Sequence, residues 1–130
     1  AGLQFGWHNH DFEFLPLEDG TYPIEAILEA APSLVLELDL AWVAVAGGSP
    51  VEWIERYKNR IISAHIKDHA PKGENLDEGG WADVGHGVLD WDEISACLRA
   101  TGIGRFVLEH DNPKDGVRFA TRSYEKLITF

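Results

Sequence analysis

The chain has 130 residues, of which 45% are hydrophobic and 25% charged, a composition typical of a folded globular domain. Eleven basic residues against 22 acidic ones give a formal net charge of −11, which disfavours nucleic acid or an anionic membrane as the partner. Five Trp, six Phe and three Tyr disfavour disorder, because side chains of this size need a core. We expect a single domain over residues 1–130.

The predicted elements alternate between apolar strands and helices. Ser49 followed by Pro50 is typical of a helix start, and Gly102 is typical of a helix end. In chain order the expected elements are a strand at 3–8, a helix at 23–31, a strand at 33–39, a helix at 51–57, a strand at 60–67, a helix at 90–100, a strand at 105–109 and a helix at 115–127. The segment 41–48 has no clear assignment.

The alternation of strands and helices predicts a parallel sheet with right-handed crossovers. Four such units make half of an α/β barrel of the (βα)8 TIM-barrel type, which needs roughly 250 residues. A doubly wound four-stranded sheet is the competing layout, but its G-x-G-x-x-G fingerprint after the first strand is absent. Half a barrel leaves two open sheet edges that a second copy of the chain could close, so we expect a homodimer or higher oligomer.

Two further features of the sequence bear on the cellular compartment of the protein. Cys97 is the only cysteine, so no disulfide can form within the chain, and no apolar run approaches the roughly 20 residues of a membrane helix. No signal peptide is visible either, and we expect a cytoplasmic protein with no membrane partner and no chemistry at Cys97. The chain lacks Met and enters an apolar run directly after Ala1 and Gly2, so we expect it to be part of a longer polypeptide.

The segment 68–87 is polar and contains five glycines. A loop of this length in a compact domain is usually functional or mobile. Trp81 lies within it, and we interpret this indole as an exposed lid over a sugar. Trp7 and Trp53 are expected in the core.

Each predicted strand ends in His, Asp or Glu. Because side chains alternate along a strand, Asp39, His65 and Glu109 can converge at the carboxyl end of the sheet, where catalytic groups collect in such barrels. Two carboxylates and an imidazole suit Mn²⁺, Co²⁺, Zn²⁺ or Mg²⁺. The four strand ends read His8-Asn9-His10-Asp11, Glu37-Leu38-Asp39, His65-Ile66-Lys67-Asp68 and Glu109-His110-Asp111.

Five motifs resemble the C-terminal half of the sugar phosphate isomerase/epimerase family, the xylose isomerase-like barrels that include endonuclease-IV-like proteins. They are WHNHDFEF (7–14), LELDLAWV (36–43), AHIKD (64–68), VGHGVLDW (84–91) and FVLEHDNP (106–113). The motifs follow one another in the family's order over the whole chain. They indicate the superfamily and leave the substrate open.

The resemblance implies a divalent metal held by one residue from each of the last four strands. It assigns Asp39, His65 and Glu109 to ligand positions. Many relatives carry Glu on the first of these strands, where this chain has His8. The fourth ligand is therefore His8, His10 or Glu13, with His8 at the matching place.

The activity that the resemblance implies is a metal-dependent isomerase or epimerase acting on a sugar or sugar phosphate. A base removes a proton beside a metal-polarised carbonyl, and a second group returns it. Glu109 is the candidate for one base, and His8 or His10 for the other. The alternatives are a metal-dependent dehydratase or lyase on a keto-sugar or inositol-like substrate, and an inactive half-barrel fragment; DNA repair is disfavoured by the charge.

Candidates for substrate binding are His10, Trp42, Lys67 and His86. Lys67 would neutralise an oxyanion or phosphate, or else pair with Asp68 or Glu37. Trp42 would stack on a sugar face or pack in the core. His86 lies between two glycines, where the resembled proteins often have a polar residue close to the substrate.

Overall fold

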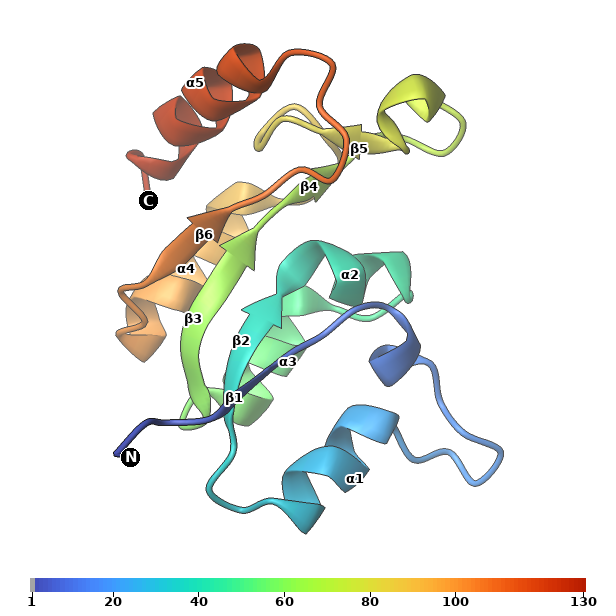
Figure 1. Ribbon diagram of the computed structural model, residues 1–130, viewed down its shortest axis with the longest axis vertical. Coiled ribbons are helices and arrows are strands. Elements are labelled where there is room, and N and C mark those ends of the chain that lie inside the picture. The colour runs from blue at the N-terminus through green and yellow to red at the C-terminus, as the bar shows by residue number, and fades with distance from the viewer. Residues whose placement is uncertain (1) are drawn as a thin grey trace.

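The computed structural model of the chain describes residues 2–130 and has a parallel sheet at its centre (Figure 1). The strands are β1 (Gly6–His8), β2 (Val35–Asp39), β3 (Ile61–Ile66) and β6 (Phe106–Leu108), and they lie in the order β1-β2-β3-β6. Every neighbouring pair is parallel. The α/β barrel-type architecture expected from the alternation is confirmed.

Helices cover one face of this sheet, with α3 (Pro50–Tyr57) and α4 (Trp91–Thr101) behind it in Figure 1. Leu36 and Leu38 of β2 and Ile66 of β3 are buried against this layer. Burying a side chain of this size contributes about 1.5–3 kcal/mol. The remaining helices are α1 (Pro23–Ala30), α2 (Leu40–Val45) and α5 (Gly116–Leu127), and among residues 2–130 no helix has the length and apolar character of a membrane span.

The opposite face of the sheet carries the polar strand residues, because side chains alternate along each strand. An irregularity in the pairing of β2 with β3 sets their register: Leu36 pairs with Ile61, but Glu37 pairs with Ser63 and Asp39 with His65. The extra residue in β3 thus brings His65 beside Asp39. Without it, Ala64 would stand opposite Asp39.

Two expected elements differ from the structure. The first strand covers only Gly6–His8, and Leu3 and Phe5 before it are largely exposed. The unassigned segment after β2 forms α2, whose N-terminus is capped by Asp39 through a 3.0 Å bond from the Trp42 amide to Oδ1. This cap leaves Oδ2 of Asp39 free for another partner.

The segment 68–87 is folded, which corrects its interpretation as an open loop. It contains β4 (Asp68–His69) and β5 (Trp81–Ala82), which pair antiparallel, and the short 3-10 helix η2 (Leu76–Glu78). A second 3-10 helix, η1 (Phe12–Phe14), lies in the loop after β1. Trp81 is only 7% exposed, so the prediction of an exposed indole lid is wrong.

The carboxylate of Asp68 holds both ends of this segment. It accepts hydrogen bonds from the amides of Gly85, Gly87 and Leu89 and, at 2.8 Å, from the Trp91 indole. A Cβ at position 87 would collide with this carboxylate. Gly87 therefore allows the backbone to approach a buried charge.

Candidate metal centre

Four side chains from four strand ends meet on the polar face of the sheet. Each of His8, Asp39, His65 and Glu109 offers one ligand atom, and these atoms lie within 4.8 Å of one another. Nδ1 of His65 contacts Oε2 of Glu109 and lies 3.8 Å from Oδ2 of Asp39. Ligand atoms stand about 2.0–2.3 Å from a bound divalent cation, so they are at most about 4.6 Å apart. The cluster therefore has nearly the dimensions of such a site.

Two atoms of the cluster are buried without a partner. Nδ1 of His8 and Oδ2 of Asp39 have no hydrogen bond among residues 2–130. Burial raises the pKa of Asp39 to about 6, and burial together with neighbouring His65 lowers the pKa of His8. An unsatisfied buried polar group costs about 1–3 kcal/mol. A cation between these atoms would pair both of them, so the residues present fit a divalent metal.

The other two first-strand candidates lie outside this cluster. Glu13 is 1% exposed, and its carboxylate accepts 2.8 Å bonds from the Trp7 indole and the His10 amide. Both of its oxygens are thus engaged in holding the loop after β1. His10 is exposed, with its ring centroid 5.2 Å from that of His8 and 5.5 Å from that of Trp42. Its position is beside the cluster, on the side of Trp42.

The orientation of His65 depends on Glu37. Nε2 of His65 lies 3.0 Å from Oε1 of Glu37, whose Oε2 accepts a 2.7 Å bond from the Ser63 hydroxyl. The Ser63 bond is the main reason why the pKa of Glu37 lies below its usual range. An ionised Glu37 accepts a hydrogen bond from the Nε2–H group of His65, which leaves the lone pair of Nδ1 facing Asp39 and Glu109. This arrangement is typical of histidines that ligate metals.

Lys67 is a buried cation next to the cluster. Its side chain is 1% exposed, and Nζ lies 2.6 Å from Asp111 and 3.8 Å from Oε1 of Glu109. The same Nζ stands 4.0 Å from the centroid of the Trp81 ring and 5.0 Å from that of Trp42. The expected pairing with Asp68 or Glu37 is therefore wrong, because Asp68 is saturated by the amides around it and the lysine reaches along the sheet to Asp111.

Solved structures that resemble the chain share this half-barrel layout, whereas no protein-family model and no curated protein matches the sequence. A sugar phosphate isomerase/epimerase from Parabacteroides distasonis ATCC 8503 aligns with 97% of the chain at 28% identity and a TM-score of 0.74. A D-tagatose 3-epimerase-like protein aligns with 98% at 25% identity and a TM-score of 0.64. The chain has the xylose isomerase-like fold. This confirms the resemblance to the sugar phosphate isomerase/epimerase family.

The chain spans less than half the length of these xylose isomerase-like structures, 45% of the first and 48% of the second. The expected half-barrel of about four strand–helix units is thereby confirmed. A probable 3-DHS dehydratase from Bacillus anthracis aligns with 81% of the chain and 43% of its own, at 18% identity and a TM-score of 0.65. At that identity the likeness shows the fold alone.

In this xylose isomerase-like fold, His86 does not belong to the cluster of four side chains. It is exposed and lines a polar cavity of about 360 Å³ together with Arg118 and Arg122. Its predicted contact with substrate gains no support from this position. The amides of the glycines on either side of it donate hydrogen bonds to the carboxylate of Asp68.

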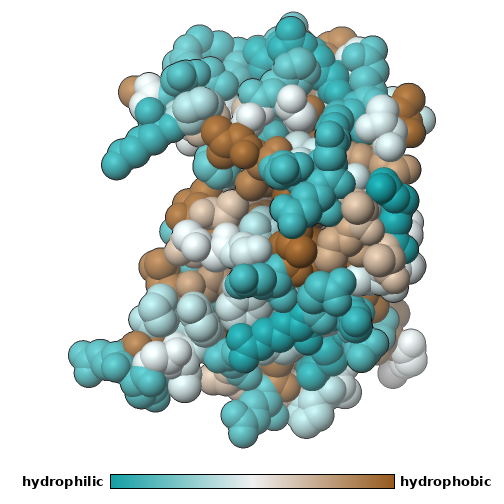
Figure 2. Space-filling model, turned by 180° about the vertical axis from the view of Figure 1, so that it is seen from behind, coloured by the Kyte–Doolittle hydropathy of each residue, from teal (hydrophilic) through white to brown (hydrophobic). Residues whose placement is uncertain are grey.

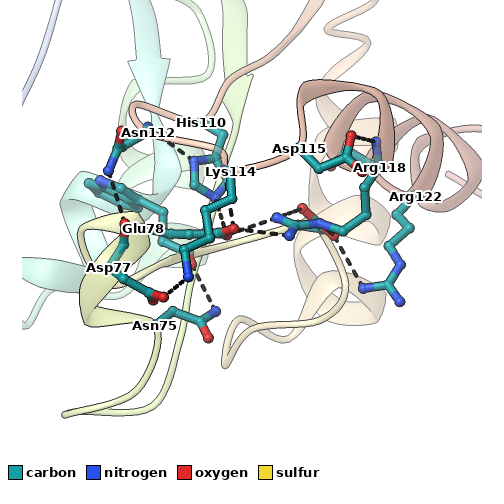
Figure 3. A network of polar contacts seen from close by, with 12 residues as sticks. Asn75, Asp77, Glu78, His110, Asn112, Lys114, Asp115, Arg118 and Arg122 are labelled. Carbon is teal, nitrogen blue, oxygen red and sulfur yellow. Dashed lines mark hydrogen bonds and ion pairs between the residues drawn. The ribbon is translucent and has the colours of Figure 1, made fainter.

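A network of polar contacts ties η2 to α5 (Figure 3). Arg118 donates to both carboxylate oxygens of Glu78, at 2.9 and 2.8 Å, and to Asp83. Glu78 also approaches His110, with 3.5 Å between Oε2 and Nε2. The hydrogen bonds from Arg118 lower the pKa of Glu78 to about 2. Since His110 lies between Glu109 and Asp111, this network supports the end of β6 that carries both.

Sequence reasoning did not predict the contacts that three residues make at this site. Glu37 orients His65, Asp111 pairs with Lys67, and the buried Asn9 fastens β1 to β2 through bonds of 3.1 and 2.9 Å to the backbone of Asp39. Glu37 could have been found, because it shares a strand face with Asp39. Asp111 and Asn9 follow strand ends without a periodic signal, so only the structure shows their contacts.

Proposed function

We propose that the protein carrying this chain is a metal-dependent sugar isomerase or epimerase that transfers a proton at a carbon next to a carbonyl. The observation that supports this most is the unpaired, buried Oδ2 of Asp39 within the cluster of His8, His65 and Glu109. A fold shared with proteins described as isomerases or epimerases supports the same reaction class.

In this proposal Asp39, His65, Glu109 and His8 hold a divalent cation. When bound, the cation would polarise the substrate carbonyl and stabilise negative charge on its oxygen. Mn²⁺, Co²⁺, Mg²⁺ and Zn²⁺ are all compatible with two carboxylates and two imidazoles. Glu37 keeps Nδ1 of His65 directed at the cluster.

The chain's own residues supply the proton transfer. Glu109 is the proposed base, because its carboxylate is partly exposed and therefore within reach of a substrate. His8, or His10 beside it, is the proposed group that returns the proton, since a ring nitrogen of an imidazole can hold and release a proton. Lys67 places a positive charge 3.8 Å from Glu109 and favours negative charge on a substrate oxygen nearby.

Metal binding can be measured on this chain directly. We expect the purified chain to bind Mn²⁺ in isothermal titration calorimetry, and Asp39→Asn and Glu109→Gln each to weaken this binding at least 100-fold. Glu125→Gln is the matched control, because Glu125 is an exposed glutamate on α5. Unchanged Mn²⁺ affinity in both cluster variants contradicts the proposal.

Turnover is tested in the full protein that carries the chain. Free and phosphorylated ketopentoses and ketohexoses are incubated with it in D₂O together with Mn²⁺. Deuterium at the reacting carbon of a recovered epimer or aldose supports the proposal. No exchange into any sugar of this panel, with Mn²⁺ bound, contradicts it.

A dehydratase or lyase is the second candidate, and the observation that favours it is His8 in the cluster. A histidine at this place leaves Glu109 as the one partly exposed carboxylate of the cluster, because Asp39 is buried, whereas two-base epimerisation uses a pair of bases. In the D₂O experiment this reaction would release water or another leaving group and form an unsaturated product, which mass spectrometry detects.

A further inference from the structure

A cavity of about 510 Å³ lies between α2 and the 69–81 segment. Its lining is mainly apolar and includes Trp42, Val45, Pro71, Leu76 and Trp81. Figure 2 shows the corresponding hollow, with hydrophobic surface inside it, seen from behind the sheet. The volume is in the range of sites that bury most of a small organic ligand.

The two tryptophans connect this cavity with the cluster. Both rings line the cavity, and both stand over Nζ of Lys67, which is 3.8 Å from Glu109. Trp42 also contacts the ring of His10, which in turn contacts that of His8. A ligand with one part at the cluster would thus find the cavity across the Trp42 ring.

The wall of the cavity is held in place by hydrogen bonds. The Asn75 side chain donates a 3.0 Å bond to the carbonyl of Trp81, and the β4–β5 pair closes the segment at its base. Arg118 holds Glu78 at the end of η2, as Figure 3 shows. A cavity built in advance costs little ordering when a ligand enters.

The side chains that line the cavity favour an aromatic ligand over a charged one. Trp42 and Trp81 meet edge to face, with centroids 4.6 Å apart, and offer aromatic surface. The charged residues of the lining are Lys72 and Glu74, which are exposed and of opposite sign. A phosphate would find no buried cation in this lining, whereas an aromatic ring would bury its surface against the indoles.

We propose that this cavity binds an apolar, aromatic group attached to the sugar, so that the substrate class is an aryl-substituted sugar and not a free sugar phosphate. The inference rests on the proposed function, since the cluster is taken as the sugar site. It adds the part of the substrate that lies away from the reacting carbon. Binding energy from such a remote group can be used to orient the reacting part.

The probes are phenyl β-D-glucopyranoside, methyl β-D-glucopyranoside and phenol, titrated calorimetrically into the protein in a buffer that contains Mn²⁺. We expect the phenyl glycoside to bind at least tenfold more tightly than either of the other two. Val45→Asp and Leu76→Asp should reduce its affinity to that of the methyl glycoside. Both side chains line the cavity and are substantially exposed, 45% and 75%, so these variants should fold.

Val117→Asp is the matched control, because Val117 is 78% exposed on α5 and does not line the cavity. Phenyl and methyl glycosides that bind equally, or that both fail to bind, overturn the inference. So do phenol binding as tight as that of the phenyl glycoside and an affinity unchanged in both cavity variants.

The same titrations separate this inference from the proposed function. Mn²⁺ binding that depends on Asp39, without a preference for the phenyl glycoside, overturns the inference alone. A preference for the phenyl glycoside that depends on Val45 and Leu76, without Mn²⁺ binding, overturns the metal-dependent function and with it the assignment of the sugar to the cluster.

Discussion

Glu37 forms a hydrogen bond with the imidazole of His65 at Nε2, the ring nitrogen that does not face Asp39 and Glu109, with 3.0 Å between Nε2 and Oε1. Replacing the carboxylate by an amide keeps the size of the side chain and removes its charge, so Nδ1 becomes a weaker ligand. We expect Glu37→Gln to weaken Mn²⁺ binding about tenfold, within the range seen when partners of metal-bound histidines are lost. Calorimetric titration measures this, with Glu125→Gln as the control, and an unchanged affinity contradicts the role of Glu37.

Asp39 should destabilise the metal-free protein at neutral pH. Its folded-state pKa of about 6 exceeds the ordinary value of 3.8, mainly because of burial. The folded carboxyl therefore binds its proton more tightly than the unfolded one, and stability falls as the pH rises from about 4 to about 6. At pH 7.5 the penalty is up to about 3 kcal/mol.

Asp39→Asn removes this penalty. In the presence of a chelator, we expect the variant to be more stable than the parent chain at pH 7.5 and equal to it near pH 4, as measured by urea unfolding. The amide oxygen can still accept the Trp42 bond that caps α2. Asp92→Asn, at a side chain that is 92% exposed, is the surface control. A gain that is the same at both pH values refutes the explanation.

Glu78 should have the opposite dependence on pH. Hydrogen bonds from Arg118 lower its pKa to about 2, against an ordinary value of 4.5. The stability that this carboxylate contributes is present above pH 4.5 and is lost as the pH falls toward 2. We expect Glu78→Gln to be less stable than the parent at pH 7, with the difference shrinking steadily below pH 4. Thermal unfolding at several pH values measures it, and a difference that persists at pH 2 would contradict this origin.

The ion pair between the buried Lys67 and the partly exposed Asp111 should be strongly coupled. Lys67→Met leaves Asp111 without its cation, and we expect it to cost roughly 1–3 kcal/mol, less than a fully buried pair because Asp111 is partly exposed. Adding Asp111→Asn should restore part of that loss in a double-mutant cycle. The exposed pair Lys58–Glu55 is the control, with a coupling of at most about 0.5 kcal/mol. Additive losses at positions 67 and 111 would exclude the coupling.

The open sheet edges predict self-association of the chain when it is expressed alone. β1 and β6 are the outer strands of the main sheet, and each has unpaired backbone groups on one side. We expect a dimer or higher oligomer, with a mass at least twice 14.5 kDa by light scattering after size exclusion. A monodisperse 14.5 kDa species would contradict this expectation.

The order of strands and helices could be predicted because apolar periodicity and the signals around Ser49-Pro50 and Gly102 agree with the structure. The hairpin within 68–87 could not. Its folding depends on Asp68, a polar residue whose partners are backbone amides 17 to 21 positions away. Such contacts leave no periodic pattern in a sequence.

The convergence of Asp39, His65 and Glu109 could be expected from their places at parallel strand ends. Their register could not, since it requires the extra residue of β3 between its pairings with Leu36 and Glu37. Alternation alone predicted a shared face for His65 and Lys67. It did not predict that Lys67 would be enclosed by Trp42 and Trp81 and paired with Asp111.

The carboxylate of Asp68 fastens the start of its segment, directly after β3, to its end, directly before α4. Residues 70–74, which form part of the cavity wall, lie between these two fixed points and precede Glu78 and its contacts with α5. This stretch can therefore be replaced as one block by residues of another protein, while β3 keeps its place beside β2. A graft of this stretch from another protein of the fold offers a route to new ligand preferences without rebuilding the cluster beneath it.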